Sequence, residues 1–223
     1  IATTAGALFP LGFAPFGYAA VAPLAIGTLF LLWVSVNARQ AALLGFYFGM
    51  GAFAVGVSWV FVSLHNYGNM PLLLAILVVA VFVSIMALYP AVCGLVQGCF
   101  CHLPSTVRLL FVMPALWVLL EWLRGQLLGG FPWLYLGYAQ VDTLFASIAP
   151  FSGVLAVSLF SAIAGSAAIL VLVGTLKQRL RAAAALIVLF GVGLLAGQAD
   201  FALPDGDAVK VAVVQNNVSL ADK

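Results

Sequence analysis

Few side chains in this sequence could carry acid–base or nucleophilic chemistry. The 223 residues include six Asp or Glu, two His and three Cys. A nucleophile needs a base beside it, and a metal site needs several closely spaced ligands. The chain shows no Ser-His-Asp arrangement and no paired carboxylates, and Cys99-Phe100-Cys101-His102 has the wrong spacing for zinc. The sequence therefore predicts no catalytic residue, no metal and no cofactor in this chain.

The residues best suited to bind a ligand lie between Pro114 and Asp142. Trp117, Glu121 and Arg124 recur at i, i+4 and i+7, so they share one face of a helix. Glu121 and Arg124 can also pair at i, i+3. Charges at membrane depth are costly and often mark a functional site. The alternative is an interfacial pair whose charged ends reach water and fix the depth of the helix.

An aromatic stretch with helix-breaking residues follows this face. Gly125, Gly129 and Gly130 permit positive φ, and Pro132 forbids continuation of the helix. Trp and Tyr rings are stable at the membrane–water interface. The stretch could therefore form the floor of a lipid-accessible active site, or it could be a plain aromatic belt. A second cluster, Gly56–Pro71, ends the third apolar segment on the same outer face, and its His65 is typical of a satisfied interfacial histidine. The residues that we expect to contact substrate are Trp59, Glu121, Arg124, Gly130, Phe131, Pro132, Trp133, Tyr138 and Gln140.

The amino-acid composition indicates whether water or lipid surrounds the elements that position these residues. Hydrophobic residues make up 65% of the chain and charged residues 6%, against about 25% charged in soluble domains. Several apolar runs are long enough to cross about 30 Å of hydrocarbon. The net charge of +2 and the lack of a basic stripe argue against nucleic acid as a partner. The sequence predicts an integral membrane protein whose immediate partner is the lipid bilayer.

Seven apolar segments are predicted. The first, at 3–14, contains Pro10 and is too short to span, so it is interpreted as the remnant of a longer helix. Gly45, Gly49 and Gly56 are expected to let neighbouring helices approach the third segment closely. The other segments are 18–36, 41–64, 71–101, 107–125, 153–176 and 182–199.

The charged residues predict an orientation. Alternate loops carry basic residues without acidic ones, and the opposite side holds all six acidic residues together with Arg124, Lys210 and Lys223. The positive-inside rule then places the basic loops and the N-terminus in the cytoplasm and the C-terminal end outside. The basic residues on the predicted cytoplasmic side are Arg39, Arg108, Lys177, Arg179 and Arg181.

The last residues change in character. A turn cluster at 204–207 precedes Val209–Gln215, which is rich in β-branched residues and is typical of a short buried strand. A lone strand is not stable. We therefore expect a transmembrane helical domain at 1–200 and an incomplete outward-facing domain beginning at 201–223.

At these motifs the sequence resembles the apolipoprotein N-acyltransferase family. The resemblance is carried by Phe13-Ala14-Pro15-Phe16, by Gly130-Phe131-Pro132-Trp133 and by Gly137-Tyr138-Ala139-Gln140. Val211–Gln215 resembles the first strand of the family's nitrilase-like domain. The fold class implied is an all-α polytopic membrane helix bundle of about seven spans, followed by the first strand of a truncated α/β nitrilase-like domain.

The resemblance also implies a function at the bacterial inner membrane. The family takes an acyl chain from a phospholipid donor, holds it as a cysteine thioester, and passes it to the amino group of a diacylglyceryl-cysteine lipoprotein. Its catalytic cysteine, glutamate and lysine lie in the nitrilase-like domain. Cys93, Cys99 and Cys101 do not match the nucleophile, so this chain alone is expected to be inactive.

Two other classes of protein fit a multispan sequence. One is a non-enzymatic protein such as a small transporter, although transporters usually need polar or broken helices near the midplane. The other is a related acyl- or glycosyl-transfer protein that shares the membrane module.

Overall fold

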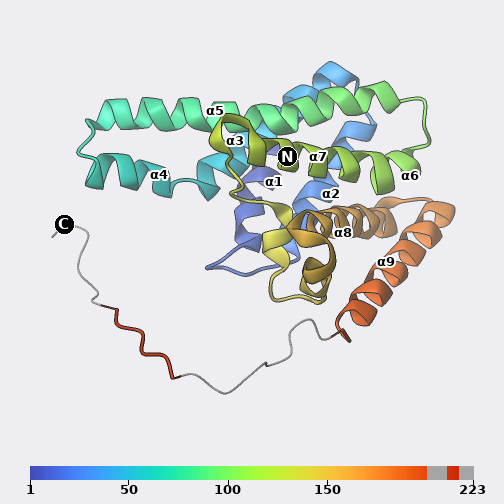
Figure 1. Ribbon diagram of the computed structural model, residues 1–223. Helices are drawn as coiled ribbons and strands as arrows, with labels where there is room; N and C mark the ends of the chain where they lie inside the picture. Colours follow the sequence, from blue (N-terminus) through green and yellow to red (C-terminus); the bar gives the residue numbers. More distant parts are fainter. Residues whose placement is uncertain (200–209, 216–223) are drawn as a thin grey trace.

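The computed structural model describes residues 1–199 and 210–215, apart from the side chain of Leu128. Within these ranges the fold is all helical (Figure 1). The α-helices are α1 (Ala2–Leu8), α2 (Val21–Val34), α3 (Ala38–Gly56), α4 (Trp59–Val62), α5 (Leu72–Gln97), α6 (Ser105–Val107), α7 (Met113–Gln126), α8 (Ala149–Val173) and α9 (Leu176–Ala196). Short 3₁₀ or π segments are η1 (Phe9–Gly12), η2 (Ser63–Tyr67), η3 (Gly98–Phe100), η4 (Arg108–Val112), η5 (Leu127–Gly129), η6 (Leu136–Gln140) and η7 (Leu144–Ile148).

Four helical stretches are long and apolar enough to cross a membrane: Leu72–Phe100, Ser105–Gln126, Leu144–Val173 and Leu176–Ala196. A fifth is obtained if α3 and the stretch Trp59–Tyr67, which are bent by 50° relative to each other, cross as one. Helix α2 has 14 residues, so it reaches about 21 Å, less than the roughly 30 Å of a hydrocarbon core. The predicted count of seven spans is therefore not confirmed among the described residues.

Glycines determine how closely α3 packs on its neighbours. A Cβ on Gly45 would overlap the backbone oxygen of Pro90 in α5, and a Cβ on Gly49 would lie 2.6 Å from the Cα of Ala87. The predicted role of these two glycines in close helix packing is confirmed. Gly56 differs, because a Cβ there would meet the Leu134 side chain at 2.5 Å instead of another long helix.

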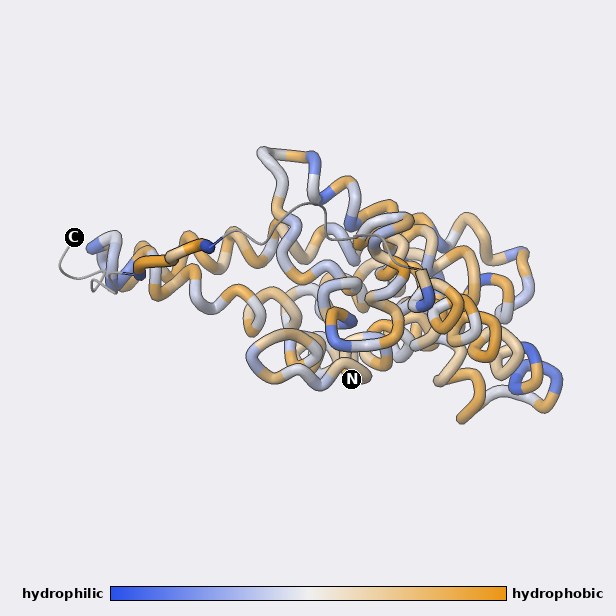
Figure 2. Tube along the Cα trace, turned by 60° about the horizontal axis from the view of Figure 1, so that its bottom comes forward, coloured by the Kyte–Doolittle hydropathy of each residue, from blue (hydrophilic) through white to orange (hydrophobic). Residues whose placement is uncertain are grey.

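The basic loops gather at one end of the bundle. Arg108 Nη2 donates to Gln97 Oε1 at 2.6 Å, which joins the end of α5 to the start of η4. Gln178 Nε2 donates to Ser105 Oγ at 3.2 Å, which joins α9 to α6. Hydrophobic residues run along the helices, and hydrophilic ones concentrate in loops and at helix ends (Figure 2). This arrangement is what the positive-inside pattern requires, since alternate loops lie together.

The predicted C-terminal strand is not confirmed. Residues 210–215 form no strand, and Val211, Val213 and Val214 are 77%, 88% and 90% exposed. The predicted turn at 204–207, Val209 and the acidic residues Asp200, Asp205, Asp207 and Asp222 lie outside the described residues.

Candidate functional site

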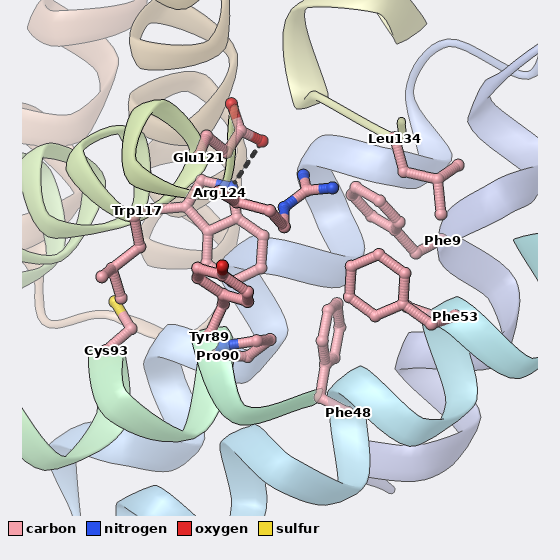
Figure 3. Close-up of a pocket in the computed structure, with 12 residues that line it drawn as sticks. Phe9, Phe48, Phe53, Tyr89, Pro90, Cys93, Trp117, Glu121, Arg124 and Leu134 are labelled. Carbon is pink, nitrogen blue, oxygen red and sulfur yellow. Dashed lines mark hydrogen bonds between the residues drawn. The ribbon is translucent and has the colours of Figure 1, made fainter. Parts of the chain in front are cut away.

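One face of α7 carries the polar residues of the candidate site. Trp117, Glu121 and Arg124 are all buried, and the two charged residues are only 3% and 4% exposed. The indole nitrogen of Trp117 donates to Glu121 Oε1 at 2.9 Å (Figure 3). The predicted shared face is therefore confirmed. The interpretation of a water-reaching interfacial pair is wrong, because neither charge reaches the surface.

Glu121 binds the backbone of a neighbouring segment. The N–H of Leu136 donates to Glu121 Oε1 at 2.8 Å, and Leu136 is the first residue of η6. The first N–H groups of a helix have no intrahelical acceptor, and a negative charge beside them is stabilising. The carboxylate of Glu121 therefore caps η6 from a different helix.

Arg124 binds the same segment at its other end. Its Nη1 donates to the carbonyl oxygens of Phe131, at 2.9 Å, and of Trp133. The guanidinium lies 5.1–5.2 Å from the ring centroids of Phe53 and Tyr135, within the range of cation–π attraction. Across the described residues, no Lys or Arg nitrogen lies within 4.0 Å of an Asp or Glu oxygen. A direct ion pair of Arg124 with Glu121 is therefore not formed.

The turn between α7 and this segment depends on two glycines. Gly129 and Gly130 have φ of +86° and +79°, as their residue type predicts. Gly125 does not break the helix and remains within α7. A Cβ on Gly125 would overlap the hydroxyl of Tyr135, so glycine here lets the Tyr135 side chain lie close to α7.

The aromatic residues after the turn form one wall of an open groove of about 690 Å³. Trp133 Nε1 donates to the carbonyl of Gly56 at 3.2 Å, and its ring lies 5.2 Å from that of Trp59. Tyr138 stacks on Tyr135 with ring centroids 5.9 Å apart. Trp59, Trp133 and Tyr138 are all about half exposed. The lining residues are Pro10, Phe13, Ala14, Pro15, Phe16, Val55, Gly56, Ser58, Trp59, Pro132, Trp133, Leu134 and Tyr138.

The structure thus brings Trp59, Pro132, Trp133 and Tyr138 together at the groove. Phe131 instead packs its ring against Phe82 of α5, with centroids 5.1 Å apart. Sequence reasoning missed the opposite wall, Pro10–Phe16. The prolines and aromatic residues of this stretch could have indicated a binding surface, but the sequence did not predict which segment would lie beside them.

Gln140 lies apart from this groove. It is 4% exposed, and its Nε2 donates to the carbonyl of Ala19 at 2.8 Å. Its Oε1 accepts from the hydroxyl of Thr143 at 3.1 Å. Gln140 therefore ties η6 to the segment before α2, and no polar atom of it is free for a ligand in the groove.

A second, small pocket of about 30 Å³ is lined by Glu121, Arg124 and Cys93 among others, and it shares Leu134 with the groove (Figure 3). Glu121 Oε2 is buried and has no hydrogen-bond partner among the described residues. Burial raises the pKa of the Tyr135 phenol above its usual range, against the opposing effect of the Arg124 charge. The Tyr135 hydroxyl is therefore neutral at neutral pH.

The remaining candidates are structural. His65 Nδ1 lies 2.8 Å from the carbonyl oxygen of Met70, and its ring packs on Phe61, which agrees with a satisfied interfacial histidine. Cys93 is fully buried, whereas Cys99 and Cys101 are exposed. In the described part of the chain, no group of three or more His, Cys, Asp or Glu could hold a metal ion.

These features define a helical membrane module with an aromatic groove at the end opposite the basic loops. Residues 5–167 match the family model described as "Apolipoprotein N-acyltransferase N-terminal domain". The chain belongs to this family.

Curated relatives agree over nearly the whole chain. The chain is 43% identical to the apolipoprotein N-acyltransferase of Methylococcus capsulatus over 219 residues, which are 98% of this chain and 43% of the relative. The protein of the same name from Coxiella burnetii is 36% identical over 220 residues, 98% of this chain and 45% of the relative. That from Nitrosomonas europaea is 37% identical over 209 residues, 93% of this chain and 41% of the relative. The chain thus spans less than half the length of these relatives.

Proposed function

We propose that this chain is the membrane part of an N-acyltransferase. The enzyme would move an acyl chain from a phospholipid, through a cysteine thioester, to the N-terminal amino group of a diacylglyceryl-cysteine lipoprotein. Family membership supports the reaction, and the aromatic groove of about 690 Å³ is the observation that connects this chain with it. Both substrates carry acyl chains, which need an apolar surface wherever they leave the bilayer.

The thiol that carries the acyl group is proposed to lie in a nitrilase-like domain that begins at 201–223. Cys93 is fully buried in α5, so it cannot meet a lipid substrate without unfolding its surroundings. Cys99 and Cys101 follow α5 at the end where Gln97 contacts Arg108, and neither lines the groove. None of the three is therefore proposed as the nucleophile, and the inactivity of residues 1–223 alone stays a prediction.

The proposed location is the bacterial inner membrane, with seven spans, a cytoplasmic N-terminus and the groove facing outward. Reporter fusions after residues 39, 104 and 179 are expected to give cytoplasmic signals, because the basic loops near these positions lie at one end of the bundle. Fusions after residues 67 and 137 are expected to give periplasmic signals. A periplasmic signal at 179 would rule out this topology.

Trp133→Ala tests the role of the groove. In the full-length enzyme we expect kcat/KM for a diacylated lipopeptide to fall about tenfold, since an aromatic contact contributes roughly 0.5–1.5 kcal/mol beyond its buried area. Amounts of folded protein should stay near normal. The measurement is turnover per folded enzyme in detergent.

Trp122→Ala provides a matched control. Trp122 and Trp133 are 48% and 49% exposed, but Trp122 lies on α7 and does not line the groove. The proposal expects Trp122→Ala to keep wild-type kcat/KM. If Trp133→Ala also keeps it, the aromatic segment is a membrane anchor and the groove is not a substrate site.

A further inference from the structure

The segment from Phe131 to Leu136 is held at both ends by charges from α7. Arg124 donates to the carbonyls of Phe131 and Trp133, and Glu121 accepts the N–H of Leu136 at 2.8 Å. All of these bonds join a buried, charged side chain to a backbone group. Two charges three residues apart on one helix therefore fix the backbone of a separate segment.

Neither charge reaches the groove. Glu121 and Arg124 line the small pocket, whereas Pro132, Trp133 and Leu134 of the segment line the groove. Glu121 and Arg124 are 3% and 4% exposed. A substrate in the groove would meet the aromatic side chains and would not touch either charge.

We propose that Glu121 and Arg124 are positioning residues, which hold the Phe131–Leu136 segment in place as the wall of the lipid groove. This inference rests on the proposed function only for the identity of the groove's occupant. It replaces the expectation that the two charged residues contact substrate.

The signs of the two charges match the backbone groups that they bind. Carbonyl oxygens need a donor, which Arg supplies, and the free N–H at the start of η6 needs an acceptor, which Glu supplies. Charge-assisted hydrogen bonds are roughly twice as strong as neutral ones. The negative charge of Glu121 and the positive charge of Arg124 also attract each other, and this attraction offsets part of the free-energy cost of burying both.

Glu121→Gln and Glu121→Leu form a matched pair in the full-length enzyme. Both substitutions remove the negative charge of residue 121, so both leave Arg124 without a nearby opposite charge. Only Gln keeps an oxygen that can accept from Leu136 N–H and Trp117 Nε1, and its amide nitrogen would occupy the position of Oε2. The pair therefore separates hydrogen bonding to the segment from charge.

For Glu121→Leu we expect KM for the phospholipid donor to rise about tenfold with kcat nearly unchanged, because a displaced wall weakens binding without touching the reacting atoms. For Glu121→Gln we expect KM within about threefold of wild type. The structural readout is the ¹⁹F resonance of Trp133 in protein labelled with 5-fluorotryptophan, assigned by its loss in Trp133→Phe. That resonance should shift or broaden in Glu121→Leu and stay in place in Glu121→Gln.

Two results would overturn the positioning role. One is an unmoved Trp133 resonance and an unchanged KM in Glu121→Leu. The other is a loss of kcat in Glu121→Gln with the resonance in place, which would show that the charge acts on the reaction. A resonance that moves in Glu121→Leu with no change in KM would support positioning of the segment and contradict the groove as the donor site. If Glu121→Leu does not fold, the double variant Glu121→Met, Arg124→Met removes both charges together and gives the same readouts.

Discussion

Gly45→Ala is expected to destabilise the helical bundle by about 1–3 kcal/mol, the usual cost of forcing an extra group into a packed interior. The new Cβ would overlap the backbone carbonyl oxygen of Pro90. Backbone cannot move aside as a flexible side chain can, so α3 and α5 must separate. Their packing is the most extensive between any two helices of the described chain, and α3 also packs against α1 and contributes Val55 and Gly56 to the groove.

Gly191→Ala is the matched control for this change. Gly191 is also a glycine inside a long apolar helix, α9, but a Cβ there meets no atom within 4 Å. Alanine has a higher helix propensity than glycine, so the control is expected to be neutral or slightly stabilising, by up to about 1 kcal/mol. Reversible unfolding in detergent, followed by circular dichroism, measures both. Equal effects of the two substitutions would contradict close α3–α5 contact as the reason that Gly45 is glycine.

The small-residue pattern and the shared face of α7 were predictable because they follow from local periodicity. Trp117, Glu121 and Arg124 lie on one face in any regular helix, whatever surrounds it. Gly129 and Gly130 have the positive φ that their residue type permits. The membrane character of the chain follows from composition alone.

The partners of the two buried charges were not predictable from spacing. The i, i+3 positions of Glu121 and Arg124 favour a direct pair, but both side chains instead bind backbone groups of a segment beyond the helix. Gln140 shares a motif with Tyr138, yet it points to Ala19 and away from the groove. The hydrogen-bond partners of these side chains depend on which segments lie together in the fold, and a pattern within one sequence does not specify this.

The count of seven spans is not confirmed among the described residues, and one reason is similar. The apolar segment at 41–64 is continuous in sequence, but α3 ends at Gly56. There the Gly56 carbonyl accepts from Trp133 Nε1 and the Leu134 side chain packs against the glycine. The chain then bends by 50°. A hydropathy pattern gives the length of an apolar run. It does not show a bend at a point where a distant segment contacts the helix.

Gly130→Ala is expected to lower acyl transfer by the full-length enzyme about 10²-fold, the cost that a 1 Å misplacement can carry. Gly130 has a φ of +79°, and a Cβ there would overlap the carbonyl oxygen of Gly125 at the end of α7. The adjacent N–H of Phe131 donates to the carbonyl of Arg124 at 2.9 Å. Displacing Gly130 therefore pulls the segment away from both the backbone and the side chain of Arg124, and the Trp133 wall moves with it.

Gly129→Ala separates this displacement from backbone strain. Gly129 has a similar φ of +86°, but a Cβ there meets nothing within 4 Å. Both substitutions place an alanine at positive φ, a sparsely populated conformation that costs about 1–3 kcal/mol, and only Gly130→Ala adds the collision with α7. Turnover of a diacylated lipopeptide per folded enzyme should therefore be near wild type in Gly129→Ala and strongly reduced in Gly130→Ala. If the two variants lose activity equally, strain in the turn is the whole effect, and the position of the groove wall relative to α7 does not control acyl transfer.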